Sequence, residues 1–316
     1  MTGTDVRCVR WTRRHVLDVE GWSRDEIYML LEQARHMEDL LSRPIKKVPA
    51  LRGKLAVNLF FENSTRTRVS FELAEKMLSA DVVNWSSSGS STAKGETLRD
   101  TAWTLEAMGA DVVVIRHGAV GAASYLASKL KRAVVMNAGD GAHAHPTQCL
   151  LDLYTAWKHL GDLEGKRVAI VGDVEHSRVA RSDIIGFRTL GCQVTLSGPS
   201  TLMPFQVDHL GVQYERDVRR ATEGADVIYL LRIQRERQQD GLFPSVDEYH
   251  RFWGATEELV REVNPKALVM HPGPINRGVE IESALADGEN SVILEQVRSG
   301  VAVRMALLYL CAGGAA

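Results

Sequence analysis

The feature that most constrains this chain is a repeated alternation of short apolar runs with segments of helical spacing. Between the runs, apolar residues recur three and four positions apart, which is typical of helices. Apolar strands alternating with helices indicate parallel sheets covered on both faces, and therefore an α/β fold. The predicted strands are 55–61, 82–83, 111–116, 134–136, 168–171, 194–196, 227–231 and 267–270.

The alternation runs twice along the 316 residues. A helix that opens at His145-Pro146 and reaches Leu160 joins the two series, since proline is well tolerated in a first turn. We expect two doubly wound parallel-sheet domains joined by interdomain helices. The first domain is predicted at 1–146 and the second at 147–290, with a last helix within 291–316 that packs back on the first.

Composition excludes several classes of protein. With 45% hydrophobic and 25% charged residues, the chain does not have the composition of a disordered protein. The 38 basic and 40 acidic residues give a formal charge of -2, which predicts neither a nucleic-acid partner nor a membrane partner. No apolar run approaches the ~20 residues that a membrane span needs.

The cysteines predict a reducing compartment. Cys8, Cys149, Cys192 and Cys311 lie too far apart for a zinc knuckle or a CxxC pair, so we expect free thiols and a cytoplasmic location. Four arginines near the N-terminus, at positions 7, 10, 13 and 14, are interpreted as a solvated arm rather than a targeting signal.

Ligands of open α/β sheets sit beyond the carboxyl ends of the strands. The string Ser64-Thr-Arg-Thr-Arg68 follows the first strong strand and leads straight into a helix. Helix N–H groups, hydroxyls and a guanidinium together favour a phosphate site over an ordinary helix cap. The Ser/Gly-rich segment 86–96 follows the next strand and contains Ser90 and Lys94. It is either a plain linker or a lid that closes on an anion.

Three further strand ends of the two series carry polar groups. Arg116 ends a strand, and His145 and Gln148 lie three residues apart at the start of the connecting helix, so they point the same way. The turn His271-Pro-Gly-Pro274 follows the last strand, and its carbonyls are suited to accept hydrogen bonds from an amide.

In the second series, residues 172–178 follow a strand but lack the glycines of a G-x-G-x-x-G turn, which excludes nicotinamide or flavin binding there. Arg178 and Arg232 stand just beyond strand ends, and Gln234 follows closely. Two guanidinium forks of this kind are suited to a dicarboxylate.

Taken in order, these motifs resemble the aspartate/ornithine carbamoyltransferase family over nearly the whole chain, from about Arg14 to the last helix. One motif alone is weak, but the complete ordered set is highly specific. The matching segments are Ser64–Arg68, Lys94–Thr97, Arg116-His117, His145–Gln148, His176–Arg178, Arg232–Gln234 and His271–Pro274.

The resemblance implies transfer of a carbamoyl group from carbamoyl phosphate to L-aspartate, an early step of pyrimidine (UMP) biosynthesis. It implies a carbamoyl phosphate-binding first domain, an aspartate-binding second domain and no cofactor or metal. The residues implied to bind carbamoyl phosphate are Ser64, Thr65, Arg66, Thr67, Arg116, His145, Gln148, Gly273 and Pro274. Of these, Arg66, Thr67, Arg116 and His145 are implied to be catalytic.

For aspartate, the resemblance implies Lys94, Arg178, Arg232 and Gln234, with Ser90 and Lys94 donated by a neighbouring subunit of at least a trimer. Whether trimers stand alone, or join a regulatory chain or dihydroorotase, stays open.

Two departures from the family pattern stand out. Gly273 stands where many relatives carry leucine, and Ala93 stands where some relatives carry a second lysine. Two alternatives are a transferase that uses ornithine or another amine, and a non-catalytic subunit that binds carbamoyl phosphate. Ornithine enzymes carry His-Cys-Leu-Pro where this chain has His271–Pro274, and a non-catalytic subunit predicts lost catalytic groups, whereas every matched group is present.

Overall fold

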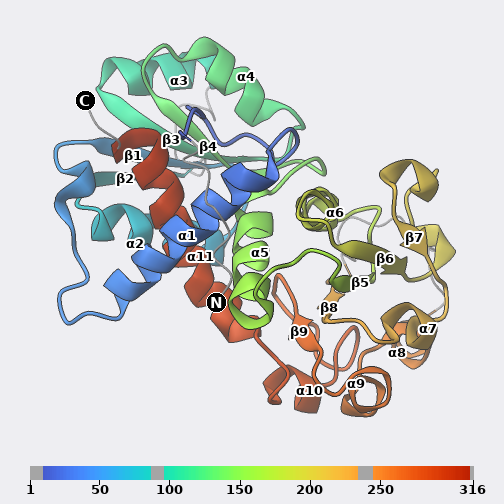
Figure 1. Cartoon of the computed structure of the whole chain (residues 1–316). Helices are drawn as coiled ribbons and strands as arrows, with labels where there is room; N and C mark the ends of the chain where they lie inside the picture. The colour runs from blue at the N-terminus through green and yellow to red at the C-terminus, as the bar shows by residue number, and fades with distance from the viewer. Residues whose placement is uncertain (1–9, 87–95, 234–244, 314–316) are drawn as a thin grey trace. The chain divides into compact units, whose positions relative to one another are not determined.

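A computed structural model describes residues 10–86, 96–233 and 245–313 (Figure 1). Ser90, Lys94 and Gln234 therefore lie outside the described residues. The chain divides into two compact units, Met1–Leu150 with Val297–Ala316 (unit 1) and Leu151–Gln296 (unit 2). The divisions fall inside helices α5 (Pro146–Leu160) and α11 (Ile293–Leu308).

Unit 1 is built on a four-stranded sheet in the order β2-β1-β3-β4, in which every pair is parallel. Helices alternate with these strands, as the sequence predicts. Besides α5 and α11, the elements are α1 (Arg24–Leu41), β1 (Leu55–Phe60), α2 (Thr65–Met77), β2 (Asp81–Ser86), α3 (Leu98–Ala107), β3 (Ala110–His117), α4 (Ala122–Lys129) and β4 (Val134–Asp140).

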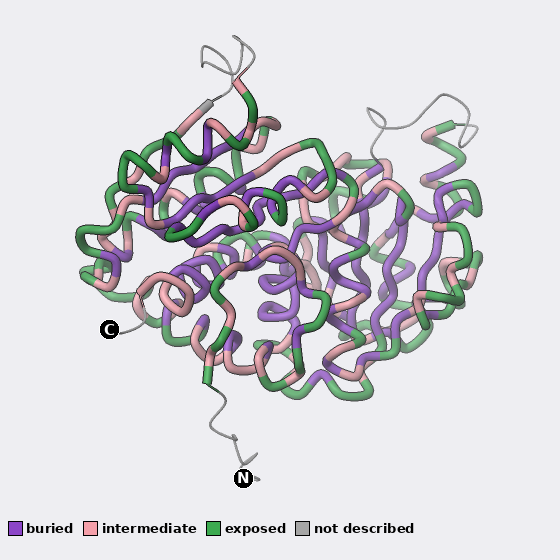
Figure 2. The backbone as a smooth tube through the Cα atoms, turned by 90° about the horizontal axis from the view of Figure 1, so that it is seen from above, coloured by how far each residue is buried: buried purple, intermediate pink, exposed green. Residues whose placement is uncertain are grey.

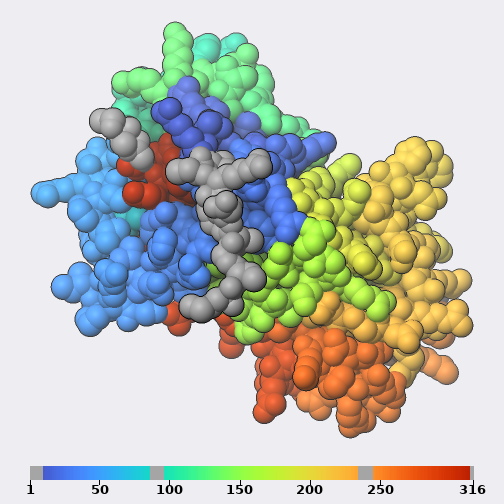
Figure 3. All heavy atoms as spheres, in the orientation of Figure 1, coloured from blue at the N-terminus to red at the C-terminus, as the bar shows by residue number. Residues whose placement is uncertain are grey.

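Helix α1 was not predicted, although its sequence carries the signals. The Ser23 hydroxyl accepts the Glu26 N–H (3.2 Å), and the Glu26 carboxylate accepts the Ser23 N–H (2.8 Å), which forms a capping box. Its buried residues are Ile27, Leu30, Leu31, Ala34 and Met37, on one helical face. The segment 42–47 that follows is exposed throughout, within the part of the chain that Figure 3 colours blue.

The core of unit 1 lies along the strands β1, β3 and β4. Every residue of β4 is buried, and Val57, Leu59, Val113 and Ile115 of β1 and β3 pack with α3 and α4 in one cluster. In Figure 2 the inner runs of the tube are mostly purple, and the turns on its outside are mostly green and pink. Helix α2 does not bury the whole apolar stripe of its sequence, because Val69 and Leu73 are 43% and 40% exposed although they follow helical spacing. Its buried face includes Ser70, Phe71 and Glu75 instead.

Unit 2 is built on a five-stranded parallel sheet in the order β7-β6-β5-β8-β9. The two-residue β7 was not predicted, because so short a strand leaves no pattern. The elements are β5 (Arg167–Val171), α6 (Arg178–Thr189), β6 (Gln193–Ser197), β7 (Gln213–Tyr214), α7 (Val218–Thr222), β8 (Val227–Leu230), α8 (Val246–Trp253), α9 (Glu257–Val263), β9 (Leu268–Met270) and α10 (Ser283–Asp287).

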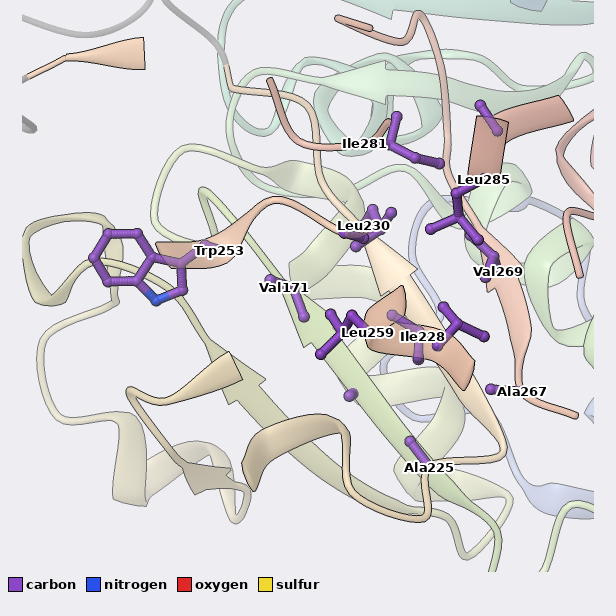
Figure 4. Packing of buried hydrophobic residues seen from close by; sticks show 14 of the residues in the cluster. Val171, Ala225, Ile228, Leu230, Trp253, Leu259, Ala267, Val269, Ile281 and Leu285 are labelled. Carbon is purple, nitrogen blue, oxygen red and sulfur yellow. The ribbon is translucent and has the colours of Figure 1, made fainter. Parts of the chain in front are cut away.

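The core of unit 2 packs the strands β5, β8 and β9 against α8, α9 and α10 (Figure 4). Ile228 and Val269 of the sheet, Leu259 of α9 and Leu285 of α10 are each at most 3% exposed. The prediction of two α/β units with parallel sheets is therefore confirmed.

One interpretation of the N-terminal segment is wrong for Arg13. Its guanidinium pairs with the Glu26 carboxylate (2.8 Å) and lies 4.8 Å from the Trp22 ring centroid, so it does not belong to a solvated arm. Within the described residues, none of the helices is long and apolar enough to cross a membrane. Cys149, Cys192 and Cys311 form no disulfide, and Cys8 lies outside the described residues.

Candidate functional site

In unit 1, the residues predicted to bind carbamoyl phosphate gather at the carboxyl edge of one sheet. Strands β1, β3 and β4 are parallel neighbours, so their carboxyl ends share that edge. Ser64 to Thr67 follow β1, Arg116 lies near the end of β3, and His145 and Gln148 follow β4. The roles of these residues in binding stay predictions.

Helix α2 starts at this edge. Ser64 is its N-cap residue, with extended backbone (φ −159°, ψ 93°), and its hydroxyl makes no capping hydrogen bond. The first intrahelical bond runs from the Arg68 N–H to the Ser64 carbonyl (3.2 Å). The N–H groups of the first turn have no intrahelical acceptor, as at any helix N-terminus, and they attract anions. The Arg66 side chain is exposed and Thr67 is buried.

The Arg116 guanidinium, near the end of β3, contacts one residue of β4 and one that follows β1, the two neighbours of β3. Its Nη1 donates to the Ala138 carbonyl of β4 (3.1 Å), and its Nε lies 3.3 Å from the Glu62 carboxylate beyond β1. Glu62 comes two residues before Ser64, so the salt bridge orients Arg116 beside the start of α2. Sequence reasoning assigned no role to Glu62, because nothing in the pattern distinguishes it from a surface acid.

His145 precedes α5 and is 4% exposed. Its carbonyl accepts the N–H groups of Gln148 (3.0 Å) and Cys149 (3.2 Å), so the first turn of α5 begins at this histidine. The helix start predicted at His145-Pro146 is confirmed.

A buried arginine of α11 links the two helix starts. Arg304 is 3% exposed, and its Nη1 donates to the Ser70 hydroxyl of α2 (2.9 Å). Its Nη2 lies 3.4 Å from the Thr147 hydroxyl of α5. Ser70 is one turn beyond Thr67, and Thr147 stands next to Gln148. The same guanidinium therefore contacts the second turn of α2 and the first turn of α5.

The buried face of α2 carries an acid. The Glu75 carboxylate accepts a hydrogen bond from the Asn58 amide of β1 (2.8 Å) and is 0% exposed. Burial raises the pKa of Glu75 to about 8, a rise to which the charge of Glu72 adds. At neutral pH the side chain is therefore mostly a neutral acid.

In unit 2, the predicted residues again share one sheet edge. Strands β5, β8 and β9 are parallel neighbours, and Arg178, Arg232 and the turn 271–274 follow them in that order. Arg178 is the first residue of α6 and is 4% exposed. Gly172 allows the loops to approach, because a Cβ there would lie 3.0 Å from the Leu231 carbonyl oxygen and its φ is +132°.

The loop before α6 depends on a buried carboxylate that the sequence analysis did not identify. Asp173 is 0% exposed, and its Oδ1 lies 2.7 Å from His176 Nδ1 and accepts the His176 N–H (3.2 Å). The Ser177 hydroxyl accepts the Ala180 N–H (3.1 Å) and caps the helix that Arg178 begins. The signal for Ser177 was present, since serine before a helix is a common cap.

Two other features lie away from the predicted residues. A hollow of about 600 Å³ in unit 1 is lined by residues of α1, α2 and α11, among them Leu73 and Arg298, and by none of the predicted site residues. Among the described residues, no group of His, Cys, Asp or Glu side chains is arranged to hold a metal ion.

Comparison with protein-family models gives two matches. Residues 14–158 match "Aspartate/ornithine carbamoyltransferase, carbamoyl-P binding domain", and residues 164–311 match "Aspartate/ornithine carbamoyltransferase, Asp/Orn binding domain".

Curated relatives agree with these matches. The chain is 58% identical over 301 residues to the aspartate carbamoyltransferase catalytic subunit of Halothermothrix orenii, covering 95% of this chain and 96% of the relative. It is 56% identical over 304 residues to that of Opitutus terrae, covering 96% of each.

Solved structures are similar over the same length. Aspartate transcarbamoylase from Trypanosoma cruzi in complex with carbamoyl phosphate is 30% identical, with a TM-score of 0.86 over 95% of this chain and 96% of that chain. The catalytic subunit of M. jannaschii aspartate transcarbamoylase is 33% identical, with a TM-score of 0.82 over 95% and 98%. Because models, sequences and structures agree over nearly all its length, this chain belongs to the aspartate/ornithine carbamoyltransferase family.

Proposed function

We propose that the chain is an enzyme that transfers the carbamoyl group of carbamoyl phosphate to the amine of L-aspartate, giving N-carbamoyl-L-aspartate and phosphate. The observation that carries this proposal is the placement of every described candidate residue at the carboxyl edge of its unit's sheet. The names of the relatives at 58% and 56% identity support aspartate as the acceptor.

The phosphate is assigned to the start of α2. Ser64, Thr65, Arg66 and Thr67 bring hydroxyls, a guanidinium and first-turn N–H groups to one place, which is the chemistry that a phosphate dianion requires. The Ser64 hydroxyl supports this, since it makes no capping bond to its own helix.

The carbamoyl group is assigned to Thr67, Arg116, His145 and Gln148, and to the turn that contains Gly273 and Pro274. The amine nitrogen bonds to the carbamoyl carbon, and a negative charge develops on the carbamoyl oxygen. Arg116, His145 and Thr67 stabilise that oxygen, and each such donor contributes ~3 kcal/mol to lowering the barrier.

The intermediate then collapses as the bond between the carbamoyl carbon and the bridging phosphate oxygen breaks, and the electron pair leaves with the phosphate. We assign the amine proton to the leaving phosphate, because His145, the imidazole among the assigned side chains, is assigned to stabilising the carbamoyl oxygen. A smaller solvent isotope effect in His145→Asn would contradict that assignment. The chemistry requires no cofactor.

Aspartate is assigned to Arg178, Arg232, Lys94 and Gln234, of which Lys94 and Gln234 lie outside the described residues. Arg178 and Arg232 follow neighbouring parallel strands, which supports their acting on one ligand. Two cations favour a second carboxylate over the cationic side chain of ornithine.

A substrate panel tests the proposal. The purified protein, carbamoyl phosphate and each of aspartate, ornithine and putrescine are combined, and phosphate release is measured. We expect turnover with aspartate and none with ornithine or putrescine. Turnover with ornithine contradicts the acceptor assignment, and binding of carbamoyl phosphate without turnover identifies a non-catalytic subunit. N-(phosphonacetyl)-L-aspartic acid, which a T. cruzi homologue binds in its solved structure, is expected to inhibit.

We also propose the finer features expected from the sequence. These are a carbamoyl phosphate-binding domain at 1–146 with the last helix, an aspartate-binding domain at 147–290, a role in pyrimidine biosynthesis and a cytoplasmic location. None of the three described cysteines forms a disulfide, which supports a reducing compartment.

The proposed assembly is a homotrimer in which Ser90 and Lys94 of one subunit complete the site of the next. Arg66→Ala and Lys94→Ala proteins are each expected to be nearly inactive. When the two are unfolded together and reassembled at random, about one quarter of the sites pair an intact Arg66 with a neighbour's intact Lys94. Recovery of about one quarter of wild-type activity supports sharing, and mixed oligomers as inactive as their parents contradict it.

A further inference from the structure

The turn that follows β9 is closed by a buried histidine and a buried glutamate. His271 Nδ1 accepts the backbone N–H of Gly273 at 2.7 Å. His271 Nε2 lies 3.2 Å from Glu280 Oε1, and the same oxygen accepts the backbone N–H of Asn276 at 2.5 Å. The His271 and Glu280 side chains are 0% and 1% exposed, so these bonds form away from water.

The contacts determine the tautomer of the ring. A backbone N–H can only donate, so His271 Nδ1 must be the acceptor. The proton of the neutral ring is therefore on Nε2, where it is donated to the Glu280 carboxylate. An imidazolium would lose the Nδ1 acceptor and with it the bond to Gly273. Glu280 thus selects the form of His271 that holds the turn.

The same turn is tied to the rest of unit 2 at both ends. The His271 N–H donates to Gln296 Oε1 (3.0 Å), and Gln296 Nε2 donates to Asp152 Oδ1 (2.7 Å). At the other end, Asn276 Nδ2 lies 3.5 Å from the Ile233 carbonyl, in the segment that carries Arg232. A shift of the turn would therefore change both the carbonyls at Gly273 and the segment of Arg232.

We propose that His271 and Glu280 are positioning residues that set the shape of the 271–276 turn for the carbamoyl group. The inference rests on the proposed function, in which Gly273 and Pro274 belong to the turn that receives that group. Neither side chain touches the substrate in this proposal. His271 acts through the N–H of Gly273, and Glu280 acts through His271 and the N–H of Asn276.

The proposal separates two ligands. Inorganic phosphate requires only the start of α2, whereas carbamoyl phosphate also requires the turn. We therefore measure the Kd of each ligand for the whole protein, together with kcat and the melting temperature. A loss confined to carbamoyl phosphate is a readout that simple destabilisation does not produce.

Glu280→Ala removes the carboxylate, and Glu280→Gln keeps an oxygen that can accept both hydrogen bonds. Glu282→Ala is the matched control, since it removes the same charge from an exposed residue two positions away. For Glu280→Ala we expect an increase of about 30- to 100-fold in Kd for carbamoyl phosphate, which is the scale of effect of a small misplacement. We expect less than about a threefold change in Kd for inorganic phosphate, and Glu280→Gln within about fivefold of wild type.

Two histidine variants divide the contacts of the ring. His271→Asn keeps an acceptor near the position of Nδ1 but cannot reach Glu280, and His271→Gln reaches Glu280 but removes the acceptor for Gly273. Because the Gly273 bond shapes the turn, we expect His271→Asn to bind carbamoyl phosphate about tenfold more tightly than His271→Gln. These variants decide the question even where Glu280→Ala does not fold.

The outcomes are distinct. Selective loss of carbamoyl phosphate affinity, with rescue by Glu280→Gln, supports the positioning role. Equal losses for both ligands, or a Glu280→Ala protein that matches Glu282→Ala, overturn it while the proposed function stands. A wild-type protein that neither binds nor uses carbamoyl phosphate overturns the proposed function, and this inference fails with it.

Discussion

The two units place their candidate residues at equivalent sheet edges but hold them in different ways. In unit 1, the residues after β1 and β4 sit at the starts of long helices, α2 and α5. In unit 2, Arg178 also begins a helix, α6, but among the described residues no helix begins directly behind the turn 271–274. There, buried side chains such as His271 and Glu280 hold the backbone instead.

The difference follows from the part of the ligand that each segment is proposed to bind. A helix start offers N–H groups in a fixed array, which suits the compact phosphate dianion. The amide of the carbamoyl group needs hydrogen-bond acceptors, which the backbone carbonyls of a turn supply. Backbone in a loop lacks the hydrogen-bond ladder of a helix, so buried polar contacts have to replace it.

The largest expected effect is that of Arg66→Ala. Arg66 is proposed to contact the departing phosphate, so its loss affects the transition state more than bound substrate. We expect kcat to fall about 10³-fold, the upper end of the range for removing one such donor. Arg68→Ala removes an exposed arginine from the same helix and serves as the control. An Arg66→Ala enzyme that keeps most of its kcat shows that the start of α2 does not bind the phosphate.

Arg232→Ala tests the other side of the comparison and is expected to have the next largest effect. Loss of a guanidinium–carboxylate pair at one ligand should raise the KM for aspartate by about 10²-fold and leave the Kd for carbamoyl phosphate near wild type. The control is Arg261→Ala, at an exposed arginine of α9. Equal loss of affinity for both ligands is the contrary result, and it assigns Arg232 to maintaining the structure of unit 2.

Much of the fold could be predicted from local pattern. Parallel strands in α/β proteins are apolar throughout, so β3 and β5 were recognisable as strands without any tertiary information. The Ser64–Arg68 string was recognisable because hydroxyls and arginines at a strand-to-helix turn are unusual. Their roles in binding come from the family resemblance, and local pattern does not supply them.

What local pattern could not supply is pairing between distant side chains. Glu280 reaches His271 only because the chain turns back beyond Pro274, and Asn58 meets Glu75 only because α2 packs on β1. Val69 and Leu73 show the reverse case, in which helical spacing indicated a helix but not which of its faces is buried.

The smallest effect on activity is expected at Glu75, which tests what holds helix α2 on its sheet. A glutamate carboxyl ordinarily has a pKa of 4.5, and in the folded protein burial raises the pKa of Glu75 to about 8. Between these pH values the folded state keeps a proton that the unfolded chain has released. The contribution of Glu75 to the free energy of unfolding therefore falls as pH rises from about 4.5 to 8, by up to about 1.4 kcal/mol per pH unit. Above that range the contribution is constant.

Glu75→Gln removes this titration and keeps the size of the side chain. We expect the variant to match wild type near pH 5 and to be more stable at pH 8, with kcat changed less than about threefold, because Glu75 lies far along α2 from its N-terminus. Hydrogen exchange of the β1 and α2 amides, compared between the two proteins at each pH, measures the local stability.

Glu72→Gln is an informative control: a hydrogen bond from Lys76 lowers the pKa of Glu72, so its contribution is present above pH 4.5 and is lost as pH falls. For each variant, the difference in stability from wild type is followed against pH. If the two differences change in opposite directions, burial rather than position on α2 sets the pKa of Glu75, since the two residues lie three positions apart on one helix. A Glu75→Gln protein whose stability follows that of wild type from pH 5 to pH 8 would show that the Glu75 carboxylate is already charged in the folded protein.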